Sequence, residues 1–557
     1  MAQGYLSVIL HAHLPYIRPA RRHAGDAEIW FYERALECYL PLIRVLDHLQ
    51  RDGVRTRLTL SLSPTLIALM RDEIIRERLI AHVNRMVELS ARELNRTALL
   101  PALREPAGTY HLRLLHLQNA LTQRCGGELL GAFREMEARG QVELITGPAS
   151  HAFLPGMLAM QPQAARCQIR LGLDAFESAF GHRPGGFWLP ECAYTPELDE
   201  ILGTEGVGYI VLDGRALERA STPAFHGIHA PVYCPSGVAA FGRDRDAACL
   251  PGCNAYGHPT DPLFRDNRRD IADDLPLDYL RPYLPDPNTR IPTGARYHRI
   301  GTTEDGSDVY QRKAALNRAA EHAEGFMRDR MHRAQNLAWK MDRPPLFVCA
   351  YDMHVFGQRW FEGTEYLDYL LRKVHFDQNV LETVTPGEYL HRHRCNQMTT
   401  PAVSSWADEG YFDQWVGPDT AWVYQHLSRA VRVMRELTES VSEQDGGDEG
   451  KDIGQDQEAQ DASPEGLGHP EANDNDLQTR ALRAAARQLV LAQSGDWVTL
   501  LQNPQHAEYA RTRLHLHLSN FARLASQIRA RQIKSGDIEA LERDWPIFGE
   551  ICPDAYR

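Results

Sequence analysis

Glu191 stands among aromatic and apolar residues in segment 186–194, which reads Gly-Phe-Trp-Leu-Pro-Glu-Cys-Ala-Tyr. A carboxylate in such a setting is costly to bury unless its charge is used. Enzymes that cleave glycosidic bonds use one carboxylate to attack the bond and another to protonate it, beside aromatic faces that hold the sugar rings. The segment therefore predicts a catalytic carboxylate, and this chemistry requires a second one.

The second carboxylate is Asp352, which ends an apolar run. Residues 346–351 read Leu-Phe-Val-Cys-Ala-Tyr and predict a buried strand. An Asp after a buried strand often caps a helix. Here aromatic residues such as Trp360 follow closely, which favours a cleft lined for sugars, and His354 is near in sequence. Asp352 is the predicted partner of Glu191.

Three histidines also follow predicted strands. His11 and His13 end the strand-like run 5–10, and residues two apart on a strand point to the same side. His151 follows the run 142–146 in the same way. Such histidines are hydrogen-bonding groups in buried turns, metal ligands, or donors to sugar hydroxyls or to a catalytic carboxylate. The pattern leaves these alternatives open.

The first part of the chain alternates strand-like runs with helical patterns. The expected strands cover 5–10, 56–62, 142–146, 186–189, 208–212 and 346–351. Helical patterns cover 28–50 and most of 75–140. This alternation predicts a parallel sheet, either open or closed into a barrel. Functional residues of such sheets lie at the carboxyl ends of the strands, where the two carboxylates are expected.

The last part of the chain is predicted to be helical. The helical patterns cover 420–441, 477–493, 505–530 and 537–543. We expect a catalytic domain over 1–400, with 75–140 as a helical insertion, and a helical domain over 401–557. Stretch 443–476 interrupts this second domain with twelve carboxylates, one lysine and almost no large apolar side chains. It cannot bury enough surface to offset the entropy of ordering, so we predict that it is disordered.

The composition is that of a soluble globular protein, with 557 residues of which 43% are hydrophobic and 24% charged. The net charge of −13 includes −11 from the acidic stretch, which leaves about −2 for the rest and argues against a nucleic-acid partner. No apolar run reaches the roughly 18 residues that span a bilayer, and the start has no basic segment of a signal peptide. We therefore expect a cytoplasmic protein with no membrane partner.

The ten cysteines are scattered along the chain, which suits reduced thiols better than a disulfide framework. Cys234, Cys249 and Cys253 have a spacing that could hold zinc, but no pair separated by two residues accompanies them. Ordinary thiols are the favoured interpretation. We expect no metal and no cofactor, and a monomer or a small homo-oligomer.

The motifs, in their order, resemble those of glycoside hydrolase family 57, and within it the 1,4-α-glucan branching enzymes. The matching segments are 11–15, 150–151, 188–192, 351–357 and 494–497. Segments 230–238 and 405–415 are similar to the same enzymes. The resemblance covers nearly the whole chain apart from the acidic stretch. It implies a seven-stranded β/α barrel and an enzyme that cleaves α-1,4 links and forms α-1,6 branches by a retaining mechanism.

The resemblance also assigns the two carboxylates. Glu191 corresponds to the nucleophile and Asp352 to the general acid/base of the family. A retaining pair lies about 5–5.5 Å apart. Asp352 must hold a proton at neutral pH, which requires a raised pKa from apolar walls such as Trp188, Tyr351 and Phe356 and from the charge of Glu191.

Substrate-binding residues are implied as well. His11, His13 and His151 would bind sugar hydroxyls near the cleavage point, and His354 would hold a neighbouring carboxylate. The remaining candidates for the sugar-binding wall are Trp30, Trp188, Trp360, Trp406, Trp415, Asp496 and Trp497. Core packing is the alternative for every tryptophan, and the polar neighbours of Trp406 and Trp415 favour those two as stacking platforms.

Branching differs from hydrolysis in the acceptor, because a glucan 6-hydroxyl must reach the intermediate before water. The family resemblance assigns this shielding to a loop, often tipped by a tyrosine, which should fall at about 214–260. Relatives commonly read Tyr-Gly-Val-Tyr-Ala-Pro where residues 226–231 read His-Gly-Ile-His-Ala-Pro. Tyr233 is the candidate substitute for the loop tyrosine. Without such a tyrosine, water competes and the enzyme leans toward hydrolysis.

The alternatives fall into three classes. An α-amylase or a 4-α-glucanotransferase would use the same site on the same glucans, namely amylose, amylopectin or glycogen. A metal-dependent polysaccharide deacetylase would use the histidines at the strand ends and would lose activity with a chelator. A glucan-binding protein without catalysis is disfavoured by the presence of both Glu191 and Asp352.

Overall fold

The computed structural model describes residues 2–18, 27–253, 257–301, 308–448 and 474–556. They form two compact units. The first unit comprises Met1–Gly147 and Gly172–Tyr411, and the second comprises Pro148–Leu171 and Phe412–Arg557. This division differs from the predicted boundary at residue 400. It ends the first unit at Tyr411 and groups a short segment of the N-terminal half with the C-terminal helices.

The first unit is built on a sheet of parallel strands that closes on itself. Its seven parallel strands are β1 (Gly4–Ala12), β2 (Leu58–Leu62), β3 (Val142–Ile145), β4 (Gly186–Phe187), β5 (Tyr209–Asp213), β7 (Ala239–Arg243) and β8 (Leu346–Asp352). They are ordered β3-β2-β1-β8-β7-β5-β4. The edges meet where Thr146 bridges to Phe187 and the Trp188 amide donates to the Thr146 carbonyl at 2.7 Å. The predicted seven-stranded barrel is confirmed.

Two short strands extend the sheet. Strand β6 (Val232–Tyr233) pairs antiparallel with β7, and β9 (Leu381–Thr383) pairs parallel with the start of β1. The sequence patterns missed β7, because its run Ala-Ala-Phe-Gly-Arg contains small residues rather than the β-branched and aromatic residues typical of strands. The predicted shielding loop at 214–260 is therefore a succession of elements that includes a barrel strand.

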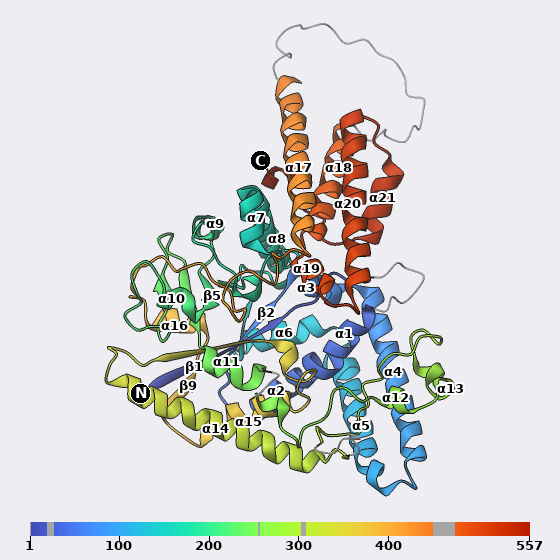
Figure 1. Cartoon of the computed structure of the whole chain (residues 1–557), viewed down its shortest axis with the longest axis vertical. Coiled ribbons are helices and arrows are strands. Elements are labelled where there is room, and N and C mark those ends of the chain that lie inside the picture. The colour runs from blue at the N-terminus through green and yellow to red at the C-terminus, as the bar shows by residue number, and fades with distance from the viewer. Residues whose placement is uncertain (1, 19–26, 254–256, 302–307, 449–473, 557) are drawn as a thin grey trace, which may run out of the picture. The chain divides into compact units, whose positions relative to one another are not determined.

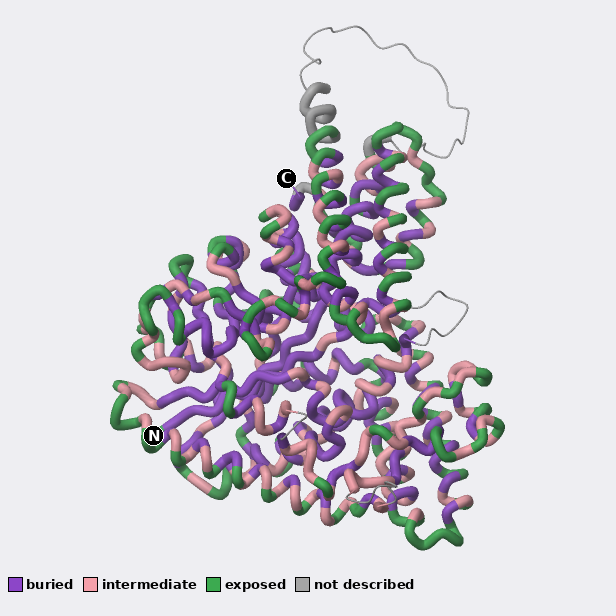
Figure 2. Tube along the Cα trace, in the orientation of Figure 1, coloured by how far each residue is buried: buried purple, intermediate pink, exposed green. Residues whose placement is uncertain are grey.

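Burial explains why these segments are strands. Every residue of β1, β2 and β5 is buried, as expected for parallel strands covered on both faces. Figure 2 shows the central strands coloured almost continuously as buried. Side chains that include Ile9, Trp188, Val211 and Phe241 fill the barrel interior. The barrel is therefore a packed core, and chemistry is confined to its ends.

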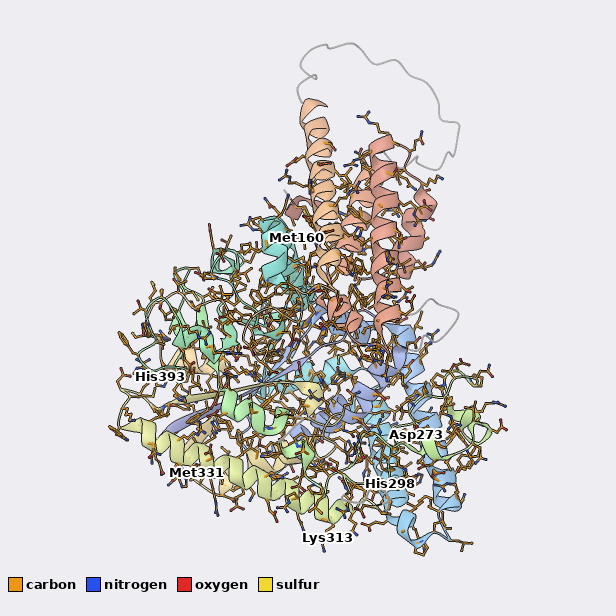
Figure 3. All side chains as sticks on the ribbon, viewed as in Figure 1. Met160, Asp273, His298, Lys313, Met331 and His393 are labelled. Atoms are coloured by element: carbon orange, nitrogen blue, oxygen red, sulfur yellow. The ribbon has the colours of Figure 1, made fainter. Side chains whose placement is uncertain are left out.

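Helices surround the barrel strands within the first unit (Figure 1). Up to β5 they are α1 (Glu28–Arg34), the π-helix η1 (Ala35–Tyr39), α2 (Leu40–Arg51), α3 (Pro64–Arg71), α4 (Glu73–Arg96), α5 (Pro101–Asn119), η2 (Ala120–Arg124), α6 (Leu129–Ala138), α8 (Pro162–Phe180), which continues from the second unit, η3 (Pro190–Cys192) and α9 (Leu198–Thr204). After β5 they are α10 (Gly214–Glu218), α11 (Arg245–Gly252), η4 (His258–Thr260), α12 (Ile271–Asp274), α13 (Leu277–Leu280), η5 (Arg281–Tyr283), α14 (Arg312–Ala338), η6 (Met353–Val355), α15 (Gly363–Phe376) and α16 (Pro386–Arg392). Figure 3 labels Lys313 and Met331, which both lie on α14. The helical insertion predicted over 75–140 corresponds to α4, α5, η2 and α6.

The second unit is helical, as the sequence patterns predict. Its helices are α7 (Leu154–Met160), the first part of α8, α17 (Ala421–Asp448), α18 (Asp474–Ala492), α19 (Gly495–Leu501), α20 (Ala507–Ala530), α21 (Ser535–Asp544) and η7 (Pro553–Tyr556). The predicted disordered stretch 443–476 is helical at both ends, because α17 continues to Asp448 and α18 starts at Asp474. Its central part, 449–473, lies outside the described residues. Within the described part of the chain, no helix combines the length and apolarity needed to cross a membrane.

Candidate active site

Two of the predicted motifs meet at the carboxyl end of the barrel. Strand β1 lies between β2 and β8, and its register places His11 opposite Ser61 on one side and opposite Asp352 on the other. Glu191 follows β4 at the same end of the barrel, since the strands are parallel. Both predicted catalytic carboxylates therefore stand on the face where parallel barrels carry their active sites.

Glu191 is held in a strained backbone conformation. Its φ is 53° and its ψ is 26°, and Cys192 also has a φ of 53°. Non-glycine residues adopt this left-handed region only when their surroundings impose it, and such strain clusters at functional sites. The Trp406 amide donates to the Glu191 carbonyl at 2.9 Å, and the Trp406 indole Nε1 donates to Oε2 of the Glu191 side chain. Both hydrogen bonds fix the direction of the carboxylate.

The loop that carries Trp406 is anchored by Arg215, in the helix α10 that directly follows β5. Its guanidinium binds Asp213 at 2.7 Å and donates to the backbone carbonyls of Ser405, Ala407 and Asp408 at 3.1, 2.7 and 2.8 Å. Arg215 is buried, so these bonds are shielded from water. The loop is therefore rigidly attached to the barrel, and the indole of Trp406 is placed by the barrel rather than by chance packing.

We expect Trp406→Phe to lower kcat/KM about 10- to 100-fold, because it removes a donor to a carboxylate that must stay ionised. A hydrogen bond to a charged group is worth roughly 1.5–3 kcal/mol. The matched control is Trp339→Phe, since that indole is 76% exposed. Steady-state rates on amylose check the prediction, and equal rates for both variants would contradict it.

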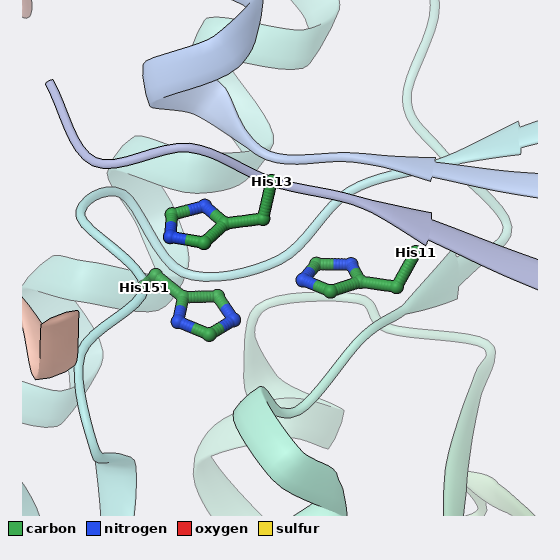
Figure 4. A group of neighbouring side chains, drawn as sticks. All are labelled: His11, His13 and His151. Atoms are coloured by element: carbon green, nitrogen blue, oxygen red, sulfur yellow. The ribbon is translucent and has the colours of Figure 1, made fainter. Parts of the chain in front are cut away.

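His11 near the end of β1 and His13 just after it form a wall at this end of the barrel. Nδ1 of His11 lies 3.0 Å from Ser61 Oγ, and Nδ1 of His13 lies 2.8 Å from Ser63 Oγ. The two imidazole rings are nearly parallel, with centroids 5.9 Å apart (Figure 4). The fully buried Trp188 ring stacks on His11 at 4.7 Å. The serines fix the ring orientations, as expected for side chains that present a nitrogen to a ligand.

Asp352 has the electrostatics that an acid catalyst needs. Burial raises the pKa of its carboxyl group above the ordinary value, while Arg34, Arg359, Arg243 and His13 oppose the shift. A carboxyl group with a raised pKa holds its proton closer to neutral pH, which matches the predicted role.

The Cys192 thiol is influenced by the charges of both carboxylates. The thiol is fully buried, and burial raises its pKa well above the ordinary value. Arg243 lowers this pKa, whereas the charges of Glu191 and Asp352 raise it. Both carboxylates and Arg243 therefore lie within electrostatic range of one thiol.

Arg243 was not predicted from the sequence. It ends β7, donates from Nε to the Ala350 carbonyl at 3.0 Å, and places its guanidinium 4.6 Å from the Trp406 ring centroid. A charged residue that ends an apolar run was the available signal, but the run was not recognised as a strand.

The segment after Asp352 is fixed by a close approach of two backbones. Gly357 has a φ of 119°, and a Cβ at this position would lie 1.8 Å from the Glu37 carbonyl oxygen. His354 lies in η6 between Asp352 and this glycine, and its carbonyl accepts from the Arg359 amide at 3.0 Å. The role predicted for the His354 side chain stays a prediction.

We expect Gly357→Ala to destabilise the fold by roughly 2–4 kcal/mol, through both the backbone strain and the clash with Glu37. Activity should fall as well, since the segment that follows Asp352 must move. Gly325→Ala on α14 is the control, because its added Cβ would meet nothing within 4 Å. Urea unfolding with parallel rate measurements checks this, and an unaltered midpoint for Gly357→Ala would show that the contact is not rigid.

Tyr233 does not lie at the catalytic end of the barrel. It pairs with Ala239, the first residue of β7, whereas Arg243 at the far end of the same strand reaches the site. The Tyr233 hydroxyl donates to the Arg394 carbonyl at 3.1 Å. The prediction that Tyr233 replaces a loop tyrosine is therefore corrected, because strand polarity places it at the amino end of the barrel.

The proposed tryptophan platforms of the first unit differ in exposure. Trp360 is only 1% exposed and packs against Tyr366 and Phe264, so it is a core residue rather than a platform. Trp406 is half-buried beside Glu191, and Trp30 is half-buried on α1. The polar surroundings noted in the sequence were informative for Trp406, while an aromatic neighbourhood at Trp360 indicated packing.

The remaining predicted residues belong to the second unit. Trp415 is 2% exposed and stacks on Phe153 at 4.6 Å, and Trp497 is 1% exposed and donates to the Leu491 carbonyl. Both are core residues of the helical unit and not open platforms. Asp496 accepts from Ser494 Oγ at 2.7 Å.

His151 also lies in the second unit and has a φ of 55°. Its carbonyl accepts from the Gly495 amide at 3.2 Å. Its strained backbone resembles that of Glu191. Its predicted contact with sugar hydroxyls stays a prediction.

The three cysteines weighed as zinc ligands are not brought together as a ligand group within the described residues. Cys234 directly follows β6 at the amino end of β7. Cys249 and Cys253 lie on or just after α11, which follows the carboxyl end of β7. The strand separates them, so the favoured interpretation as ordinary thiols agrees with their positions.

Sequence comparisons identify the family. The model of glycosyl hydrolase family 57 matches residues 7–403, and a model described as 1,4-alpha-glucan branching enzyme, C-terminal, matches residues 466–556. A 1,4-alpha-glucan branching enzyme of Thermococcus kodakarensis is 26% identical over an alignment that covers 97% of this chain and 76% of that protein. A probable 1,4-alpha-glucan branching enzyme of Mycobacterium tuberculosis is 25% identical, with 95% and 93% covered.

Solved structures share the fold of this chain. An alpha-amylase from Thermotoga maritima is 29% identical with a TM-score of 0.87, over 100% of this chain and 99% of that chain. A branching enzyme from Pyrococcus horikoshii shares the fold with a TM-score of 0.82 at 24% identity, over 100% and 97%. The first family match spans more than half of the chain and includes both Glu191 and Asp352. With its barrel, its paired carboxylates and this match, the chain belongs to glycosyl hydrolase family 57.

Proposed function

We propose that this protein is a 1,4-α-glucan branching enzyme. The observation that carries the proposal is the match of two successive models, the family 57 model over 7–403 and the branching-enzyme C-terminal model over 466–556. The proteins of Thermococcus kodakarensis and Mycobacterium tuberculosis, which align over 97% and 95% of this chain, are named as a branching enzyme and a probable branching enzyme, which supports the same assignment. Glucans with α-1,4 links, such as amylose, amylopectin or glycogen, are the proposed substrates.

The reaction follows from the two carboxylates. Glu191 attacks the anomeric carbon of an α-1,4-linked glucose while Asp352 gives its proton to the departing glycosidic oxygen. The products are a β-linked glycosyl-enzyme and the free non-reducing end of the leaving glucan. Asp352 then takes the proton from a glucan 6-hydroxyl, the oxygen attacks the anomeric carbon, and Glu191 is released. The two inversions leave an α-1,6 branch.

The surrounding residues support each step. The Trp406 indole donates to the Glu191 carboxylate and orients it, and burial raises the pKa of Asp352 above its ordinary value. His11 and His13 have fixed rings on the wall beside Asp352, where they would donate to sugar hydroxyls. The proposed roles in glycogen synthesis and in the cytoplasm follow from this activity and from the sequence.

The runner-up is an α-amylase, in which water replaces the 6-hydroxyl. The alpha-amylase of Thermotoga maritima supports it through its fold likeness over the whole chain. The position of Tyr233 at the amino end of the barrel also leaves the family's shielding tyrosine without an assigned counterpart.

Incubation with amylose distinguishes a branching enzyme from an α-amylase. We expect new α-1,6 links, counted by debranching and chain-length analysis, to exceed new reducing ends several-fold. Reducing ends without branches would favour the amylase. Activity that persists in EDTA would argue against the metal-dependent deacetylase, and acetyl release from an acetylated polysaccharide would support it.

A further inference from the structure

Arg34 occupies a special position on the helix that follows β1. It ends α1, and the next residue begins the π-helix Ala35–Tyr39. π-helical turns are rare, and those that do occur often lie at functional sites. Trp30 lies four residues earlier, so the two side chains share one face of the helix. An aromatic ring and a guanidinium one turn apart form a surface suited to a sugar, which offers both a flat face and hydroxyl oxygens.

The helix that carries Arg34 is fastened to the loop that follows Asp352. Gly357 packs directly against the Glu37 carbonyl of the π-helix. The Gln358 side chain donates to Glu33 at 2.9 Å, one residue before Arg34. Arg265 binds both oxygens of Glu37 at 2.9 and 3.1 Å from the other side. The distance between Arg34 and Asp352 is therefore set by rigid contacts, not by flexible loops.

The guanidinium of Arg34 has unused donors. Its Nε and Nη1 atoms are buried and have no hydrogen-bond partner among the described residues. Buried donors on a charged group are costly when they are unpaired. The cost is increased by Arg359, a second guanidinium whose positive charge repels that of Arg34 and attracts the negative charge of Asp352. A residue that is unfavourable for folding at this position is typical of a binding site that awaits its ligand.

The contacts of its helix place Arg34 on one side of the cleavage point, because Gly357 and Gln358, which follow Asp352, contact Glu37 and Glu33. Among the charges near Asp352, Arg34 has the largest effect on its pKa, which it lowers. Arg34 thus stands on the Asp352 side. Asp352 protonates the glycosidic oxygen, so this side holds the leaving glucan and then the acceptor.

We propose that Arg34 is a substrate-binding residue of the leaving-group and acceptor side, where its guanidinium donates hydrogen bonds to glucan hydroxyl oxygens. The inference rests on the proposed retaining reaction and deepens it. Sugar oxygens provide the acceptors that Nε and Nη1 lack within the protein. By holding the acceptor glucan beside Asp352, Arg34 favours attack by the 6-hydroxyl over attack by water.

The test compares Arg34→Met with the unaltered protein on amylose. We expect the ratio of new reducing ends to new branches to rise at least about 5-fold, because a lost acceptor contact slows transfer but not hydrolysis. At saturating amylose, the rate of donor cleavage, followed by loss of iodine colour, should stay within about 3-fold. Arg34→Lys should give an intermediate ratio, since it keeps the charge but not the planar fork. Arg51→Met, at an exposed position on α2, is the control that should change nothing.

Stability separates a binding role from a structural one. Since its buried donors are unpaired, Arg34→Met should keep or raise the Tm. A lower Tm with all rates reduced together, or an unchanged ratio of reducing ends to branches, would overturn the proposal.

If the unaltered protein makes no branches, the branching assignment fails but Arg34 remains testable. Its loss should then raise the KM for maltooligosaccharide hydrolysis at least about 5-fold with the Tm preserved. An unchanged KM in that case would overturn the role of Arg34.

Discussion

Glu191→Gln lowers kcat/KM on amylose at least about 10⁴-fold, because an amide cannot form the glycosyl-enzyme ester. The fold should survive, since glutamine is nearly isosteric and keeps an oxygen that can accept from the Trp406 indole. Circular dichroism and the Tm check the fold, and branch formation checks the activity. Glu197→Gln is the matched control, an exposed glutamate six residues along the chain that should leave the rate unchanged.

Azide makes the test specific to a nucleophile. In Glu191→Ala, azide fits the space of the missing carboxylate and attacks the same face, so the product from an activated α-glucosyl donor is a β-glucosyl azide. In Asp352→Ala, azide takes the place of the acceptor and gives the α-glucosyl azide. Activity that is retained in Glu191→Gln, or an α-azide from Glu191→Ala, would sink the assignment of Glu191.

Asp352→Asn should lower kcat/KM on amylose about 10²- to 10⁴-fold, the range expected for loss of a general acid. An α-maltosyl fluoride donor should recover much of the rate of the first step, because fluoride leaves without a proton. Burst kinetics with this donor measure that step separately. Equal losses on amylose and on the fluoride would show that Asp352 does not act as an acid.

The raised pKa of Asp352 also predicts a pH dependence of stability. Its folded-state pKa lies above the ordinary value of 3.8, so its contribution to stability is full below about pH 4 and is lost as the pH rises through the folded-state pKa. Asparagine does not ionise, so Asp352→Asn removes this loss of stability at higher pH. Its Tm should exceed that of the unaltered protein at pH 7 to 8, and the difference should vanish near pH 4. A variant that is less stable at pH 8 would contradict the burial argument.

The positions of the two candidate carboxylates could be predicted from the sequence alone. Glu191 and Asp352 each follow a strand whose apolar composition is readable locally, and the strand ends of a parallel barrel all face the same way. The helical second unit was equally readable, because amphipathic periodicity is a property of each segment alone. Strand β7 was missed since small residues give a weak local signal.

The side chains that surround the carboxylates could not be predicted in this way, because they are brought together by tertiary packing. Trp406 reaches Glu191 because Arg215, nearly two hundred positions earlier, fixes its loop. Trp360 is packed in the core although its neighbours in sequence are as aromatic as those of a platform. The helix segment that carries Arg34 contacts the segment that follows Asp352, although the two lie more than three hundred residues apart in the chain. Local patterns report burial and periodicity, but the convergence of distant side chains depends on register and packing, which the sequence does not display.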